Sequence, residues 1–439
     1  MRILVPLTGI YTVLNSNFLK ERIGEGKMDR LNQVSGHLSP STTKSILSKN
    51  PDDVVIVASY RTAIGKGHKG SFKDVGSDYI LLKFLEAFLA KTQVDPSLID
   101  DIACGNVLKV RSGICEHRAA AISAGIPYTT PIVAVNRQCG SGLIAISDIA
   151  NKIIAGEIDC GLAVGVESMT KDFALGQSVV SKALENHTEM KKSKISMGIT
   201  NENIADKYHV SRREQDEFAA KSFQKAEEAS ESGLFADEIL PIESLIEEKD
   251  AEGNVYFKRV TVDKDEGIRK GITAESLSQL NPVFKKDGST HAGNSSQVSD
   301  GAAGVLLMRR SFAEENGFNI EGKFIKCISV GVPPEIMGVG PAIAIPRILK
   351  KTNLSVDDIA AFEVNEAFAA QCLYSIKACK IPEEKVNVNG GAIALGHPVG
   401  VTGARQYATI LRLLKPGEIG LTSMCIGSGM GSASIVVKE

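Results

Sequence analysis

The stretch "IDDIACGNV" (residues 99–107) has a close counterpart in the second half of the chain, "VDDIAAFEV" (residues 356–364). Both stretches are followed by a glycine-rich turn and later by a Gly-Leu strand. Cys139 follows the first stretch, and His397 follows the second, at nearly the same spacing. The match predicts two copies of one α/β unit, with Cys139 and His397 at equivalent strand-to-helix turns. If the units pack face to face, both turns meet in one cleft. A chance match of short strand signals is the alternative.

The rest of the chain fits a layered α/β protein with an insertion. Short Val/Ile/Ala strands alternate with helical stretches from Asp53 onward, and a more charged segment interrupts this rhythm between the two copies. Within the segment, Ser211 and Glu214 form a capping-box pattern for a helix that runs toward Gly233. A lid beside the cleft and a purely structural subdomain both fit this insertion. We expect a leader at 1–51, an N-terminal half at 52–170 and about 291–315, a lid or loop domain at 171–290, and a C-terminal half at 316–439.

Cys139 stands in "VNRQCGSGLIAI" (residues 135–146), between an apolar strand pattern and a helical one. At such a turn, backbone N–H groups and the positive end of the helix dipole can stabilise a thiolate. The small residues that follow it let a substrate approach the backbone closely. Cys139 is therefore the predicted nucleophile; the alternative is a cysteine buried as a small hydrophobe.

Three further motifs supply groups that could act with this thiol. His397 lies in the glycine-rich stretch "NVNGGAIALGHPVGVTGAR", which indicates an imidazole open to a ligand. "VNEAFAAQ" contains Asn365, which can hold a water or polarise an oxygen, and Glu366, which is either its anchor or a helix-start charge. "SMCIGSGMGSA" contains Cys425, with an unobstructed N–H at Gly427.

Composition excludes several other classes of protein. The 439 residues carry a net charge of −2 without a basic block, so nothing indicates a nucleic-acid partner. No run of about 18 apolar residues occurs, which argues against a membrane span. The eight cysteines show no C-x-x-C pair, so neither a zinc site nor a disulfide framework is indicated, and they are expected to be reduced thiols.

These motifs together resemble the thiolase family, and most closely its peroxisomal 3-ketoacyl-CoA type. "VNRQCGSGL", "NEAF", "GGAIALGHPVGVTGAR" and "CIGSGMG" agree in order and spacing, and the resemblance covers nearly all of residues 52–439. "MGITNEN", "AGNSSQVSDGAA" and "GVPPEIMGVGPAIAIP" are also thiolase-like. Two positions depart from the pattern: His291 stands where threonine is common, and Val401 where cysteine is frequent.

The resemblance implies a fold and a mechanism. The implied fold is a duplicated α/β unit in layered α-β-α-β-α arrangement with an inserted lid or loop domain. In the implied reaction, His397 activates Cys139, which accepts the acyl group of a 3-ketoacyl-CoA, and Cys425 is the acid/base at the departing acetyl-CoA. One oxyanion hole would combine His397 with a water held by Asn365, and the other would use the N–H groups of Cys139 and Gly427. No metal or redox cofactor is expected, because coenzyme A is a substrate.

The family also suggests contacts and partners. Ser296 is expected to contact the pantetheine of CoA, Met197 to line the pantetheine tunnel, and Arg269 to contact the adenine. The ordinary alternative for each is a packing or surface residue. Acyl-CoA and CoA are the expected ligands, and a homodimer is the expected assembly. The runner-up function is a biosynthetic acetoacetyl-CoA thiolase. A ketoacyl synthase-like condensing enzyme is less favoured, since Cys425 would not be expected there.

The leader carries a separate signal. In "MDRLNQVSGHL" (residues 28–38), Arg30 and His37 are nearly two helical turns apart, beside an apolar stripe. The pattern resembles an amino-terminal type 2 peroxisomal targeting signal, which implies a peroxisomal import receptor as a partner. A mitochondrial presequence in the first 27 residues is the rival interpretation, and Met28 as the true start is a third.

Overall fold

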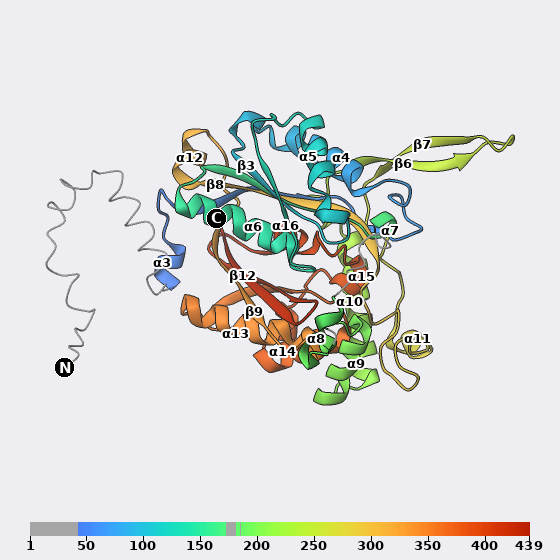
Figure 1. The fold of residues 1–439 in the computed structure, drawn as a ribbon. Coiled ribbons are helices and arrows are strands. Elements are labelled where there is room, and N and C mark those ends of the chain that lie inside the picture. The colour runs from blue at the N-terminus through green and yellow to red at the C-terminus, as the bar shows by residue number, and fades with distance from the viewer. Residues whose placement is uncertain (1–42, 173–180, 185) are drawn as a thin grey trace, which may run out of the picture.

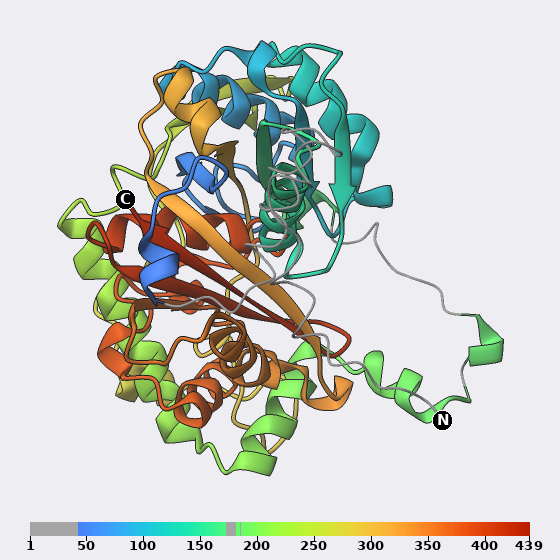
Figure 2. The same ribbon diagram turned by 90° about the vertical axis from the view of Figure 1, so that its left-hand side faces the viewer.

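The computed structural model describes residues 43–172, 181–184 and 186–439. The predicted targeting face around Arg30 and His37 lies outside these residues. Figures 1 and 2 show two lobes, one above the other, with long helices between them.

The strands form one hydrogen-bonded path that contains two similar halves. The order along this path is β10-β11-β12-β9-β1-β8-β5-β3-β4, and the short β2 pairs with β8. β1 and β9 join the halves through Val55 and Ile56, which pair with Lys323 and Gly322. The strands are β1 (Val54–Arg61), β2 (Gly65–Lys66), β3 (Asp101–Gly105), β4 (Ile132–Val135), β5 (Cys160–Ser168), β8 (Ser299–Arg309), β9 (Gly322–Gly331), β10 (Ile359–Val364), β11 (Ile419–Ile426) and β12 (Met430–Lys438).

The two halves repeat the same strand pattern, which confirms the predicted duplication. In the first half β3 runs parallel to β5, and β5 is followed by the antiparallel β8 and β1. In the second half β10 runs parallel to β11, and β11 is followed by the antiparallel β12 and β9. β3 and β10 contain the two stretches that match in sequence. Each half also has a parallel partner on the outer side of its matching strand. In the first half β4 pairs with β3, and in the second half Val386 forms a parallel bridge with Phe362 of β10.

Helices complete five layers. The strands are apolar on both faces, so each face needs a helical cover. On β3, for example, Ile102 packs with the outer helices and Ala103 packs with the inner pair. The outer helices of the first half are α4 (Ser77–Thr92) and α5 (Ile114–Ser123), those of the second half are α13 (Gly340–Thr352) and α14 (Ala369–Cys379), and the inner pair is α6 (Ser141–Ala155) and α16 (Thr402–Leu413).

The inner pair of helices meets at glycines. A Cβ at Gly142 of α6 would lie 2.7 Å from the Gly400 carbonyl oxygen, and a Cβ at Gly403 of α16 would clash with the backbone of Leu143. The two helices begin at the turns that carry Cys139 and His397. Their close packing therefore places the two turns at neighbouring points of the middle layer.

The segment between the halves forms helices and a hairpin. Its capping box at Ser211 and Glu214 is present, and Gly233 just beyond α10 is left-handed, with a φ of 72°. The β6–β7 hairpin projects from the body at the upper right of Figure 1. The elements are α7 (Met169–Asp172), α8 (Thr188–Ser193), α9 (Met197–Tyr208), α10 (Arg212–Glu231), β6 (Ile242–Lys249), β7 (Val255–Val262) and α11 (Ala274–Ser278).

Short elements fill the remaining connections. α3 precedes β1, α12 follows β8, and α15 lies in the loop that carries His397. None of the helices in the described residues combines the length and the apolar character that crossing a bilayer requires. The bounds are α3 (Thr43–Leu47), α12 (Arg310–Glu315) and α15 (Ala392–Leu395).

Candidate active site

Cys139 lies in a tight turn between β4 and α6. The preceding residue, Gln138, has a φ of 45°, a left-handed conformation that is uncommon for a non-glycine residue. Its side chain donates from Nε2 to Ser428 Oγ at 2.8 Å, and Ser428 is also left-handed. A Cβ at Gly140 would lie 2.5 Å from Ile426 Cδ1. The turn of the first half is therefore fixed directly against the end of β11 in the second half.

The packing of the Cys139 turn against the end of β11 brings Cys139 close to Cys425. Burial raises the pKa of the Cys139 thiol to about 11, while the backbone N–H groups of Gly427 and of Cys139 itself oppose the rise. Burial also raises the pKa of Cys425, and a negative charge on Cys139 raises it further. A thiolate at one of the two positions therefore disfavours a thiolate at the other.

The backbone N–H of Gly427 reaches the Cys139 sulfur, and the surroundings of Gly427 leave room only for glycine. A Cβ at Gly427 would clash with Gln138 Oε1 and would lie 3.6 Å from Met197 Sδ. Met197 begins α9 and packs against Cys425, Met337 and Phe368. The structure thus places Met197 at the site together with Cys139, Cys425 and Gly427.

His397 is buried and held on both sides of its ring. Its Nδ1 lies 2.6 Å from Thr402 Oγ1, and Thr402 Oγ1 donates to the Pro398 carbonyl at 3.2 Å. Nδ1–H is therefore the donor to Thr402, which leaves the Nε2 lone pair as the reactive one. Burial, together with the smaller effect of the Arg405 charge, lowers the pKa of His397 to about 3. The imidazole is neutral at physiological pH and free to accept a proton.

Asn365 lies beside the reactive nitrogen of His397. Its Nδ2 is 3.3 Å from His397 Nε2, and its buried Oδ1 has no hydrogen-bond partner among the described residues. A buried amide oxygen without a partner is costly unless water or a ligand satisfies it. The amide can therefore hold a water next to the imidazole.

Two of the expected CoA contacts have different settings. Ser296 is half-buried, and its backbone N–H donates to the Ala367 carbonyl at 3.0 Å, which places it beside the Asn365 turn. Arg269 is exposed, with its guanidinium carbon 5.9 Å from the centre of the Phe223 ring of α10. Ser296 is thus near the centre, whereas Arg269 stands on the surface of the inserted segment.

Two positions that depart from the family pattern are buried. His291 Nε2 lies 2.7 Å from Asp216 Oδ1, so this histidine ties its loop to α10. Val401 packs in the middle helical layer with α6 and α16. Both side chains therefore have packing or hydrogen-bond contacts of their own.

The sequence analysis missed several residues that hold the site. Gln138 and Thr402 are within quoted motifs, but only the structure shows that they position Cys139 and His397. Glu167, at the end of β5, accepts a hydrogen bond from Gly400 N, three residues after His397. Nothing in a single sequence links residues that are so far apart. The described residues contain no cluster of three or more His, Cys, Asp and Glu side chains suited to a metal ion.

Comparison with known proteins identifies the class. The thiolase N-terminal domain matches residues 54–311, and the thiolase C-terminal domain matches residues 318–438. The chain belongs to the thiolase family.

Its relatives include peroxisomal members of that family. The peroxisomal 3-ketoacyl-CoA thiolase B of Candida tropicalis is 62% identical over 414 residues, which cover 94% of this chain and 100% of that protein. The crystal structure of the dimeric peroxisomal thiolase of Saccharomyces cerevisiae is 56% identical, with a TM-score of 0.84 over 90% of this chain and 100% of that chain. A second structure of the yeast enzyme, 53% identical with a TM-score of 0.75 over 90% and 100%, is described as five-layered α-β-α-β-α with two core domains of identical topology. The fold predicted from the sequence is thereby confirmed.

Proposed function

We propose that this chain is a 3-ketoacyl-CoA thiolase of peroxisomal β-oxidation, an acetyl-CoA C-acyltransferase. Its relatives named for this activity match it over nearly their whole length. The observation that carries the proposal is that Cys139 of the first half interacts with Cys425 of the second, while α6, which begins just after Cys139, packs at Gly142 against Gly400 in the loop of His397. A condensing enzyme with one cysteine would have no use for Cys425.

The reaction begins with proton transfer from the Cys139 thiol to His397 Nε2. Burial disfavours each charge alone, but the thiolate and the imidazolium stabilise each other when they form together. The thiolate attacks the 3-keto carbon of the substrate. The developing oxyanion needs fixed donors in a site that excludes water. The backbone N–H groups of Cys139 and Gly427 are the proposed donors.

The bond between carbons 2 and 3 then breaks. The shortened acyl chain stays on Cys139, and acetyl-CoA leaves as an enolate whose thioester oxygen carries the charge. His397 and the water held by Asn365 are the proposed partners of that oxygen. Cys425 donates the proton to the methylene carbon, which suits its raised pKa because a buried thiol keeps its proton until a strong base appears.

A second thiol completes the cycle. Cys425, now a thiolate, removes the proton from the thiol of an incoming CoA, and the CoA sulfur attacks the acyl group on Cys139. Cys139 leaves as a thiolate and takes its proton back from His397, so the products are a shortened acyl-CoA and a free Cys139 thiol. Both cysteines return to their starting protonation states, so the cycle balances without a metal or redox cofactor.

The inserted segment, residues 171–290, is the proposed cover for CoA. Met197 already packs beside Cys425 and suits the pantetheine end, with Ser296 close to the same turn. Arg269 has its guanidinium on the surface, where an adenine nucleotide can stack on it or pair with its charge. The boundaries 52–170 with about 291–315, and 316–439, are the proposed halves that this segment covers.

The proposed assembly is a homodimer, in line with the dimeric yeast relative. β4 lies at one end of the strand path, and Val133 within it is 39% exposed. Ile122 of α5 and Tyr128 of the following loop are also exposed, and α5 lies next to β4. An apolar sheet edge of this kind suits pairing with a second copy.

Steady-state thiolysis tests the proposed activity. Purified protein, CoA and a long-chain 3-ketoacyl-CoA are expected to yield acetyl-CoA and the acyl-CoA two carbons shorter. Acetoacetyl-CoA serves as the comparison substrate, because a biosynthetic enzyme would cleave it and reject the long chain. Turnover of acetoacetyl-CoA alone would overturn the assignment to fatty-acid degradation.

A further inference from the structure

The loop that carries His397 is buried but has almost no regular structure. It runs from Asn387 to α16 and includes two left-handed glycines, Gly390 with a φ of 81° and Gly396 with a φ of 107°. Buried backbone N–H groups need partners, and short-range bonds within the loop satisfy several of them. The N–H of His397 donates to the Gln297 carbonyl at 3.1 Å, and that of Gly391 donates to Ser222 Oγ. Two buried carboxylates accept further N–H groups of the loop, one before His397 and one after it.

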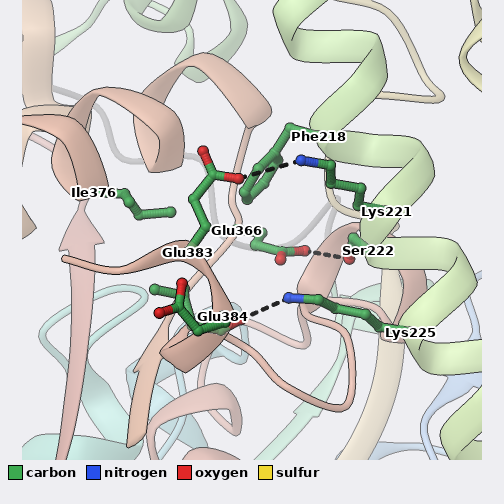
Figure 3. A pocket seen from close by; sticks show the side chains of 9 residues that line it. Phe218, Lys221, Ser222, Lys225, Glu366, Ile376, Glu383 and Glu384 are labelled. Atoms are coloured by element: carbon green, nitrogen blue, oxygen red, sulfur yellow. Dashed lines mark hydrogen bonds and ion pairs between the residues drawn. The ribbon is translucent and has the colours of Figure 1, made fainter.

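Glu366 holds the loop before His397. It is 2% exposed, and its Oε2 accepts from Ile393 N at 3.2 Å and from Ser222 Oγ of α10 at 2.6 Å, as Figure 3 shows for Ser222. Its Oε1 accepts from Asn387 Nδ2 at 2.8 Å. A Cβ at Gly391 would clash with this carboxyl group. One carboxylate thus joins the Asn365 turn, the inserted segment and the His397 loop.

Glu167 holds the loop after His397 and comes from the other half of the chain. It is fully buried, and its Oε2 accepts from Gly400 N and Val107 N, both at 3.0 Å. Its Oε1 accepts from Leu108 N at 3.1 Å and Asn106 Nδ2 at 3.0 Å. All four neighbours donate, and no lysine or arginine in the described residues pairs with it. A carboxylate can accept all four bonds, whereas an amide would turn an NH2 group toward N–H donors.

We propose that Glu167 and Glu366 are positioning residues for the thiolase reaction, which together hold the His397 loop so that Nε2 faces the Cys139 thiol. One pins the loop to the first half and the other to the second half and the inserted segment. This inference rests on the proposed function, because it assigns the two acids an effect only through His397. It explains why two acids that form no ion pair within the described part of the chain are buried on either side of a neutral histidine.

The test uses the rate at which iodoacetamide alkylates Cys139, followed on the peptide that contains it. This rate reports how readily Cys139 becomes a thiolate, and it needs no substrate. Glu167→Gln and Glu366→Gln in the full-length protein are each expected to lower it about 10- to 100-fold, because a small displacement of a catalytic group has effects of this size. The KM for acetoacetyl-CoA is expected to change little while kcat falls in parallel.

Glu202→Gln is the matched control. Glu202 is also a buried acid that accepts backbone N–H groups, at Ser289 and Thr290, but it does not touch the His397 loop. The Glu202→Gln protein is expected to be less stable than the wild type, but its Cys139 is expected to be alkylated at the same rate. If Glu167→Gln and Glu366→Gln lower stability as Glu202→Gln does and neither slows alkylation, Glu167 and Glu366 are merely structural and the proposal is overturned.

A variant without the imidazole, His397→Ala, distinguishes the proposed positioning role of Glu167 from the proposed role of His397 as the base. His397→Ala alone is expected to slow alkylation, and adding Glu167→Gln to it is expected to change the rate by less than about twofold. No effect of His397→Ala would overturn both the base assignment and the present inference. A faster rate in Glu167→Gln would show that the acid acts only by its charge, which raises the pKa of Cys139.

A second variant covers the case in which Glu167→Gln does not fold. A Cβ at Gly400 would lie 2.7 Å from Glu167 Oε2 and 3.0 Å from the Gly105 carbonyl, so Gly400→Ala displaces the loop while keeping the acid. Gly400→Ala is expected to slow Cys139 alkylation in the same range as Glu167→Gln. A normal rate in a folded Gly400→Ala protein would contradict the proposal.

Discussion

At the residue scale, the site depends on two cysteines with different tasks. Cys139 lies where backbone N–H groups reach its sulfur, whereas Cys425 is enclosed by Met197, Met337 and Phe368. The backbone donors oppose the rise that burial causes in the pKa of Cys139, whereas burial and the charge of a Cys139 thiolate both raise the pKa of Cys425. This difference supports the proposed roles of Cys425 as the acid/base and Cys139 as the nucleophile.

Substituting Cys425 tests that division of labour. Cys425→Ser is expected to acylate Cys139 still, because His397 activates the nucleophile, but to exchange the methyl hydrogens of acetyl-CoA with deuterated water about 10² to 10⁴ times more slowly. Mass spectrometry of acetyl-CoA after incubation in deuterated water measures the exchange. Equal exchange in wild type and variant would remove Cys425 from the mechanism.

Thr402 provides a test of how the imidazole is held. Thr402→Val keeps the shape of the side chain but removes the hydroxyl that accepts from His397 Nδ1–H. We expect kcat to fall about tenfold with little change in KM, because the ring loses its fixed orientation but remains present. An unchanged kcat would show that burial alone orients His397.

The sequence predicts reacting residues, but it does not indicate the residues that position them. Cys139, His397 and Cys425 stand in unusual local settings, so their chemistry is visible in a short stretch of sequence. Glu167 is separated from Gly400 by 233 positions, and nothing local marks the hydrogen bond between them. Contacts of this kind depend on tertiary packing, which a single sequence does not record.

At the scale of elements, the site depends on how closely α6 and α16 approach. The sequence predicted both helices and their equivalence, since each follows a strand at similar spacing. It did not predict the contact at Gly142 and Gly403, because a glycine in a helix pattern shows no preference for a partner. That contact sets the separation of the two turns that carry Cys139 and His397.

A single methyl group between the helices tests this contact. Gly403→Ala would place a Cβ against the backbone of Leu143, which cannot rotate away. We expect a loss of about 1–3 kcal/mol in the free energy of unfolding, despite the roughly 1 kcal/mol that alanine gains over glycine in a helix. The midpoint of urea unfolding measures the loss.

Gly331→Ala is the control for that experiment. Gly331 ends β9, a Cβ there would meet nothing within 4 Å, and its backbone is not left-handed. Its unfolding midpoint is expected to stay close to that of the wild type. If Gly403→Ala is as stable as Gly331→Ala, the helices can separate and their contact does not fix the site.

At the scale of the whole molecule, duplication accounts for the architecture. The matching strand patterns place β3 and β10 at equivalent positions, and the layers follow from strands that are apolar on both faces. The duplication could be predicted because the two matching stretches are recognisable in the amino-acid sequence. The path of the inserted segment could not be predicted, since its α9 and α10 derive their placement from contacts with the second half, such as Ser222 with Glu366.

The leader is tested in cells. A fluorescent fusion of residues 28–60 is expected to become punctate and to coincide with a peroxisomal marker, whereas Arg30→Glu is expected to leave it diffuse. The reason is that Arg30 and His37 would share the helical face that an import receptor recognises. Mitochondrial staining by the full-length leader would favour the rival interpretation.

The most direct test of the account is the identity of the acyl-enzyme. Full-length protein is mixed with a long-chain 3-ketoacyl-CoA in the absence of added CoA, quenched in acid and digested for mass spectrometry. The account predicts one acyl group, two carbons shorter than that of the substrate, on the peptide that contains Cys139, together with an equal amount of acetyl-CoA. An acyl group of full substrate length, or acylation of Cys425 in place of Cys139, would contradict it.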